Sequence, residues 1–176
     1  MASKKKVSKK LVKKTKTKAK KRKVLAIPKG YHAVTPYLII DGAAKAIAFY
    51  KKAFGAKEIF RNEMGKKIGH AEIQIGDSKL MLADEFEACG AKSAKHFGGS
   101  SMSIHLYVKN VDKTTKQAIS AGATVIRAIQ DQFYGDRSAL LKDPFGYSWN
   151  VSTHTEDLSK KELKKRAEKF CAEFKG

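Results

Sequence analysis

The chain has 176 residues, 42% of them hydrophobic, which is enough for one ordinary domain with a buried core plus tails. Its formal net charge of +20 is unevenly distributed, because thirteen Lys and Arg without an acid lie in residues 1–26, a basic surplus of four lies in residues 160–176, and residues 27–159 carry only +3. Cys89 and Cys171 form no CxxC pair, so we exclude a disulfide framework and a thiolate zinc site. No apolar run has the length of a signal peptide or a membrane span, so we exclude export and a membrane partner. We expect a cytoplasmic protein.

Residues 1–26 open with "MASKKKVSKKLVKKTKTKAKKRK", in which lysines are interspersed with Ala, Ser, Thr and Val and no aromatic residue occurs. Such a segment repels itself and buries too little apolar surface to offset its ordering entropy, so we expect it to be disordered. Two interpretations stay open. The segment binds nucleic acid or another polyanion non-specifically, at the nucleoid or after nuclear import, or it only extends the chain and keeps it soluble.

The first half of the domain, which we place at residues 27–158, predicts a strand, a helix and three further strands. A strand is expected over residues 34–40, and the helix that follows takes Asp41 as its N-cap and ends at Gly55. A β-branched run comes next. The strictly alternating "KIGHAEIQI" then turns at "GDS" and returns as "KLMLAD", which completes the set of strands.

The second half repeats this order. A strand is expected over residues 102–108, followed by a helix that has Asn110 or Asp112 as its N-cap and ends at Gly122. In both halves Gly-Ala follows the helix, and the two pairs lie 67 positions apart, which is about half of the domain. This spacing favours an internal duplication.

A hairpin closes the second half. The strand "RSALLK" turns at "DPFG" and returns as "YSWNVST". Asp143, Pro144 and Gly146 occupy favoured positions of a type I turn. Trp149 alternates away from the polar side of its strand, so we expect it in the core.

A last helix is predicted in residues 159–176. Ser159 and Glu162 have the spacing of a capping box. The apolar residues fall on one face, and they are Leu163, Ala167, Phe170, Cys171 and Phe174. We expect this helix to dock on the body of the protein or on a second subunit.

The duplicated βαβββ order, with "AIAFYKKAFGA" and "LKDPFGYSWNV", resembles the vicinal oxygen chelate superfamily of glyoxalases, bleomycin and fosfomycin resistance proteins and extradiol dioxygenases. "GYHAVTPYLII", "GHAEIQIGDSKLMLADE" and "DQFYGDR" are similar to its PhnB-like branch. The resemblance implies an α+β fold of two modules, at about residues 31–85 and 101–154, whose curved sheets form a cleft with the helices outside. It also implies a homodimer.

In that family a divalent metal is bound by His, Glu or Gln side chains on the first and last strand of each module. By resemblance, these positions fall at Thr35, Ser103, Asn150 and near Met81. Two hydroxyls, an amide and a thioether match zinc, nickel or ferrous iron poorly. We therefore expect no metal cofactor.

Strand alternation places other polar groups on the cleft side. Ser103 shares its face with His105 and Tyr107, and His70 shares its face with Glu72 and Gln74. Two interpretations of His70, Glu72 and His105 stay open. They form a displaced metal site or an acid–base pair, or they are the hydrogen-bonded lining of a ligand cavity.

In "QFYGDR", Tyr134, Asp136 and Arg137 are expected at the mouth of the cleft, with Asp136 orienting the guanidinium of Arg137 toward an anionic ligand. The alternative is an ordinary Gly-Asp turn with a surface ion pair.

These observations lead to three hypotheses of function. The first is a protein that binds, sequesters or transforms a small polar or anionic molecule in the cleft without a metal. The second is a metal-dependent lyase, isomerase or dioxygenase, and the third is a dimeric scaffold tethered to nucleic acid by its tail. No catalytic residue is assigned, and the expected ligand contacts are Thr35, His70, Glu72, Ser103, His105, Tyr134, Asp136, Arg137 and Asn150.

Overall fold

A computed structural model describes residues 24–173, so most of the predicted tail, residues 1–26, lies outside the described part of the chain. The first module contains β1 (Tyr37–Ile40), α1 (Ala43–Phe54), β2 (Lys57–Met64), β3 (Lys67–Ile75) and β4 (Ser78–Asp84). The second contains β5 (Ser103–Tyr107), α2 (Val111–Ala121), β6 (Thr124–Asp131), β7 (Asp136–Lys142) and β8 (Ser148–His154). Two short 3-10 turns, Glu87–Cys89 and Ala94–Phe97, connect the modules, and α3 (Lys160–Glu173) follows them.

The two modules have the same sheet topology. The strand orders are β1-β4-β3-β2 and β5-β8-β7-β6, with the first and last strands of each module parallel and the other pairs antiparallel. This confirms the predicted α+β fold of two tandem βαβββ modules. None of the helices in the described residues is long and apolar enough to cross a membrane.

The start of α1 differs from the prediction. Gly42, not Asp41, is the N-cap residue, with a left-handed φ of 89° that favours glycine. Asp84 Oδ1 accepts hydrogen bonds from Gly42 N at 3.0 Å and Ala43 N at 2.8 Å, while its Oδ2 accepts from Ile68 N at 2.7 Å. Because Ile40 pairs with Asp84 across the parallel strands, the carboxylate at the end of β4 already lies at the helix start.

The start of α2 follows one of the two predictions. Asn110 is the N-cap, and its side chain accepts a hydrogen bond from Lys113 N at 2.8 Å. Asp112 lies in the first turn and pairs with Arg137 instead. Gly55 and Gly122 end the two helices in left-handed conformations, as predicted.

Asp143 joins the modules. Its Oδ2 accepts hydrogen bonds from Tyr50 OH of α1 at 2.8 Å and from Trp149 Nε1 at 2.9 Å, and its Oδ1 accepts from Phe145 N and Tyr147 N at 2.9 Å each. The bond from Gly146 N to Asp143 O, at 3.2 Å, closes the predicted turn. The turn is therefore also a buried contact between the halves.

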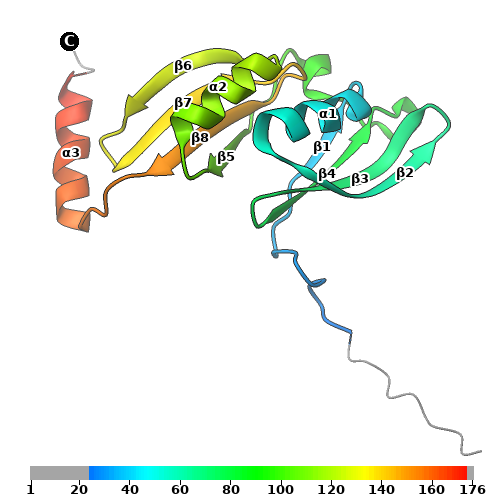
Figure 1. Cartoon of the computed structure of the whole chain (residues 1–176), viewed down its shortest axis with the longest axis horizontal. Coiled ribbons are helices and arrows are strands. Elements are labelled where there is room, and N and C mark those ends of the chain that lie inside the picture. The colour runs from blue at the N-terminus through cyan, green and yellow to red at the C-terminus, as the bar shows by residue number, and fades with distance from the viewer. Residues whose placement is uncertain (1–23, 174–176) are drawn as a thin grey trace, which may run out of the picture.

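Aromatic rings complete this joint. Trp149 is 1% exposed, and its ring centre lies 4.5 Å from that of Phe54 and 5.3 Å from that of Tyr50. The prediction that Trp149 belongs to the core is confirmed. Figure 1 shows α1 and α2 near the middle of the molecule, the sheets extending away from them, and α3 at the end beyond module two.

Candidate functional site

Each sheet has one face covered by its helix and one polar face. In β3, Ala71, Ile73 and Ile75 are buried, whereas the alternate residues are only partly buried. We name two surfaces by their residues. The module-one polar face contains Tyr31, Tyr37, His70, Glu72 and Lys79, and the module-two polar face contains His105, Tyr107, Arg127, Asp136, Ser138, Asn150, Ser152 and His154.

The module-one polar face carries a chain of four polar side chains. His70 Nε2 lies 3.5 Å from Glu72 Oε1, and Tyr37 OH lies 3.1 Å from His70 Nδ1. Tyr31 OH donates a hydrogen bond to Glu72 Oε2. This bond raises the pKa of Tyr31 to about 12 and holds the pKa of the Glu72 carboxyl below its ordinary value.

The segment before β1 covers this face. The ammonium of Lys79 lies 3.7 Å from the centre of the Tyr31 ring, which is a cation–π contact. Tyr31 is thus held both by its hydroxyl and by its ring. His70 and Glu72 contact each other as predicted. The hydroxyls of Tyr37 and Tyr31 contact the other ring nitrogen of His70 and the other carboxylate oxygen of Glu72.

Arg127 lies at the centre of the module-two polar face. Its Nη2 donates to Ser138 Oγ at 3.1 Å and to Asn150 Oδ1 at 3.3 Å, and Asn150 Nδ2 lies 2.9 Å from His105 Nδ1. The strand register places Arg127, Leu140, Asn150 and His105 in one row across the four strands.

The charge of Arg127 is not compensated nearby. Among the described residues, Arg61, Arg137 and Arg166 each pair with carboxylates, but Arg127 has no ion pair within residues 24–173. Its partners Ser138 and Asn150 are neutral, and its Nε is buried without a hydrogen bond in this part of the chain. A partly buried guanidinium with only neutral partners can bind an anion.

Asp136 organises the far end of the same face. Its side chain is only 3% exposed, and it accepts a hydrogen bond from Tyr107 OH at 2.9 Å. His154 Nδ1 lies 2.7 Å from Asp136 Oδ1, and His154 Nε2 lies 3.0 Å from Asp157 Oδ1. The bond to Asp136, and next that to Asp157, raises the pKa of His154.

The expected arrangement of "QFYGDR" is wrong in one respect. Asp136 does not orient Arg137, because the two residues are adjacent in β7 and point to opposite faces of the sheet. The guanidinium of Arg137 binds Asp112 on α2, with Nε at 3.1 Å and Nη2 at 3.0 Å, and Asp131 at 3.1 Å. The ring of Tyr134 packs edge-on against that of Phe133, with 5.2 Å between the ring centres.

The metal positions implied by the resemblance do not fit a divalent cation. Asn150 Oδ1 accepts from the guanidinium of Arg127, so a second positive charge there is repelled. Thr35 Oγ1 donates to His32 O at 3.2 Å, Met81 is half-buried, and Ser103 is exposed at the start of β5. In residues 24–173, no three His, Cys, Asp or Glu side chains are grouped as a metal site, so His105 does not join His70 and Glu72.

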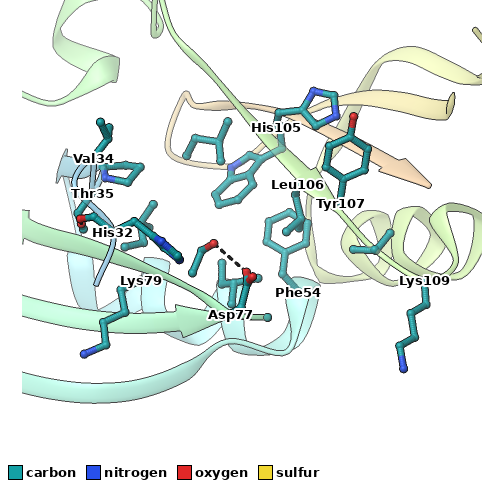
Figure 2. A pocket seen from close by; sticks show the side chains of 18 residues that line it. His32, Val34, Thr35, Phe54, Asp77, Lys79, His105, Leu106, Tyr107 and Lys109 are labelled. Atoms are coloured by element: carbon teal, nitrogen blue, oxygen red, sulfur yellow. Dashed lines mark hydrogen bonds between the residues drawn. The ribbon is translucent and has the colours of Figure 1, made fainter. Parts of the chain in front are cut away.

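A cavity of about 770 Å³ lies between the modules. Figure 2 shows Leu106 and Phe54 near its middle, while Lys79 and Lys109 extend outward. Thr35 lines it, as do residues of β5. These include His105, Leu106 and Tyr107, and because His105 also contacts Asn150, β5 borders both the cavity and the module-two polar face.

Five of the nine predicted ligand contacts lie on the two polar faces of one chain, and Thr35 lines the cavity together with His105. His70 and Glu72 lie on one polar face, and His105, Asp136 and Asn150 lie on the other. No hydrogen bond in the described part of the chain joins a side chain of one polar face to a side chain of the other.

Three important residues escaped the sequence analysis. Arg127 lies between two register shifts of the β6–β7 pair, and such bulges redirect a side chain in a way that simple alternation does not predict. A lone arginine in the apolar run "TVIRAI" was the available signal. Tyr31 and His154 were missed because their partners, Glu72 and Asp136, are distant in sequence and come close only in the folded chain.

Comparison with known proteins identifies relatives over most of the chain. The sequence model of the Glyoxalase/Bleomycin resistance protein/Dioxygenase superfamily matches residues 31–151. Uncharacterized proteins of Mycobacterium bovis and Mycobacterium tuberculosis H37Rv are each 40% identical over 136 residues, which cover 74% of this chain and 89% and 79% of theirs, respectively.

Several solved structures share the fold. TioX from Micromonospora is 20% identical, with a TM-score of 0.56, and the match covers 73% of this chain and 100% of that one. A protein from Pseudomonas aeruginosa is 23% identical, with a TM-score of 0.57 and coverage of 70% and 98%. A PhnB protein from Bacillus cereus is 14% identical, with a TM-score of 0.55 and coverage of 69% and 99%.

Proposed function

Since the chain belongs to the glyoxalase/bleomycin resistance protein/dioxygenase superfamily, we propose that it binds a small anionic molecule on the module-two polar face without a divalent metal. The observation that carries this proposal is the guanidinium of Arg127, which has neutral partners and no carboxylate in the described residues. Burying a charge without a counter-charge is costly, so an anionic ligand that supplies one gains correspondingly in affinity.

Neighbouring side chains fix the orientation of the groups that would contact the ligand. Ser138 and Asn150 fix the guanidinium, and Asn150 also holds His105 through its Nδ1. The other ring nitrogen of His105, Nε2, makes no hydrogen bond in residues 24–173. The carboxylate, phosphonate or phosphate of a ligand would bind Arg127, and His105 would contact the adjoining atoms or exchange a proton with them.

We also propose that the protein is a homodimer in which a second copy covers the polar faces. Within residues 24–173 of one chain, no side-chain hydrogen bond joins the two faces. Large apolar side chains remain exposed on the sheets, including Phe60 and Met64 in module one and Tyr107 and Ile126 in module two. Exposed apolar groups of this size beside polar sites are typical of interfaces.

The proposed ligand class is tested by thermal unfolding in the presence of methylphosphonate, inorganic phosphate, pyruvate and the neutral control glycerol. Binding to the folded protein raises the melting temperature by mass action. We expect one or more of the anions, but not glycerol, to raise it. The Arg127→Met variant should lose this rise, and Arg61→Met should keep it, because Arg61 already pairs with Glu58 and Glu63. An equal rise in both variants would contradict the proposal.

A further inference from the structure

Helix α3 is attached to the end of module two by a few defined contacts. The ring of Phe170 lies 4.8 Å from that of Phe133, and Arg166 binds Glu156 through Nη1 at 2.7 Å and Nη2 at 2.9 Å. Glu162 N donates to Ser159 Oγ at 3.2 Å, which confirms this bond of the predicted capping box. The predicted helix is present and one aromatic contact joins it to module two. No α3 residue within the described range is fully buried, and Leu163 and Cys171 are exposed, so the expected docking of its apolar face stays a prediction.

The opposite half of α3 is basic. At 100° per residue, its five lysines occupy one half of the helix circumference, and all five are exposed; the exposed Glu168 lies on the same half, so the net charge of that half is +4. The lysines are Lys160, Lys161, Lys164, Lys165 and Lys169. None of them forms an ion pair within residues 24–173, whereas Arg166 on the other half pairs with Glu156 and Glu162.

The half-buried residues show which side faces the body. They are Glu162, Arg166, Ala167 and Phe170. The contacts of Arg166 and Phe170 therefore lie on the side opposite the exposed lysines. The superfamily match ends at residue 151, so α3 lies outside the part that this chain shares with that family model.

We propose that the lysine half of α3 binds the phosphate backbone of double-stranded nucleic acid without sequence preference. Unpaired lysines on a rigid helix neutralise phosphates and release counterions, which is sufficient for non-specific binding. The proposal is independent of the small-molecule site.

The chemistry of the helix favours nucleic acid over a lipid surface. A helix that lies in a membrane needs a free apolar face to insert. In α3 the ring of Phe170 already packs on Phe133, and no aromatic side chain lies on the lysine half. What remains available is positive charge spread along about 14 Å of helix, from Lys160 to Lys169, which suits a line of phosphates.

The test measures the fluorescence anisotropy of a labelled random-sequence DNA duplex titrated with the full chain. One variant changes the five α3 lysines to Gln. A control variant makes the same change at five exposed lysines elsewhere, namely Lys45, Lys57, Lys66, Lys92 and Lys113. Circular dichroism verifies that both variants keep the helical content of the wild type.

We expect the α3 variant to bind the duplex at least about tenfold more weakly than the control at low salt. The slope of its log binding constant against log salt concentration should be smaller in magnitude by up to about 4.5. The same difference should persist after deletion of residues 1–26. Equal affinities of the two variants would overturn the proposal, as would absence of duplex binding by the wild type at low salt. Loss of binding to phosphatidylserine vesicles but not to DNA would overturn it in favour of a membrane surface.

Discussion

Arg127 Nη2 donates to Asn150 Oδ1 at 3.3 Å, which places a fixed positive charge beside the position where the resemblance implies a metal-binding glutamate. Under the proposed function, the guanidinium would attract an anion at this place, as a divalent cation would. The anion would then be held by hydrogen bonds and charge, without coordination to a metal.

The metal-dependent alternative makes an opposite prediction that dialysis can decide. We expect the purified protein to retain no stoichiometric zinc, nickel or manganese at neutral pH, because Arg127 repels cations from Asn150, and His105 does not reach His70 and Glu72 within one chain. One equivalent of metal, lost in both the His70→Ala and the His105→Ala variants, would establish the metal-dependent alternative instead.

Replacing Asp143 should destabilise both modules together. Asp143→Ala removes the acceptor of four buried donors, two of which belong to Tyr50 and Trp149. Leaving buried donors unpaired costs about 1–3 kcal/mol each before relaxation, so we expect a loss of at least about 3 kcal/mol in the free energy of unfolding. Urea unfolding measures this loss. Asp77→Ala, at an exposed turn, should change it by less than about 0.5 kcal/mol.

His154 should make stability depend on pH. Its pKa is raised above 6.5 in the folded protein, so its contribution is fully present below the unfolded value and is lost as the pH rises through the folded value. We expect His154→Gln to lose stability relative to wild type at about pH 6 and to approach it at about pH 8. The exposed His32 provides the control variant, His32→Gln. A pH-independent difference between His154→Gln and wild type would contradict this assignment.

The hydroxyl of Tyr31 should control the ionisation of Glu72. In Tyr31→Phe the hydrogen bond is gone, so the pKa of the Glu72 carboxyl rises toward its ordinary value of 4.5. A carbon-detected NMR titration of the carboxyl measures the change. Tyr134→Phe should leave the value unaltered. An unchanged pKa in Tyr31→Phe would show that this segment does not hold Glu72 in solution.

The element order was predictable because each strand and helix carries its own local signal. Alternation in "KIGHAEIQI" and the glycines after both helices are examples of such signals. The cap of α1 was not predictable, since Asp84 is distant in sequence and reaches Gly42 only through the pairing of β1 with β4. Local capping rules favoured the adjacent Asp41, but the carboxylate of Asp84 makes the bonds.

The site was predicted in part for a similar reason. Periodicity placed His105 on the polar face correctly, and it lies beside Asn150 there. The expected orientation of Arg137 by Asp136 was wrong because both residues belong to β7, where neighbours face opposite ways. Arg127 was missed because the register shifts on both sides of it change the direction that alternation predicts.

The central claim is tested most directly by following the Nε–H signal of Arg127 in an NMR titration with methylphosphonate. We expect this signal, with those of His105 and Asn150, to shift and saturate in the wild type and in Arg61→Met. In Arg127→Met the shifts of His105 and Asn150 should disappear. Saturable shifts at other sites, with the Arg127 signal unmoved, would contradict the account.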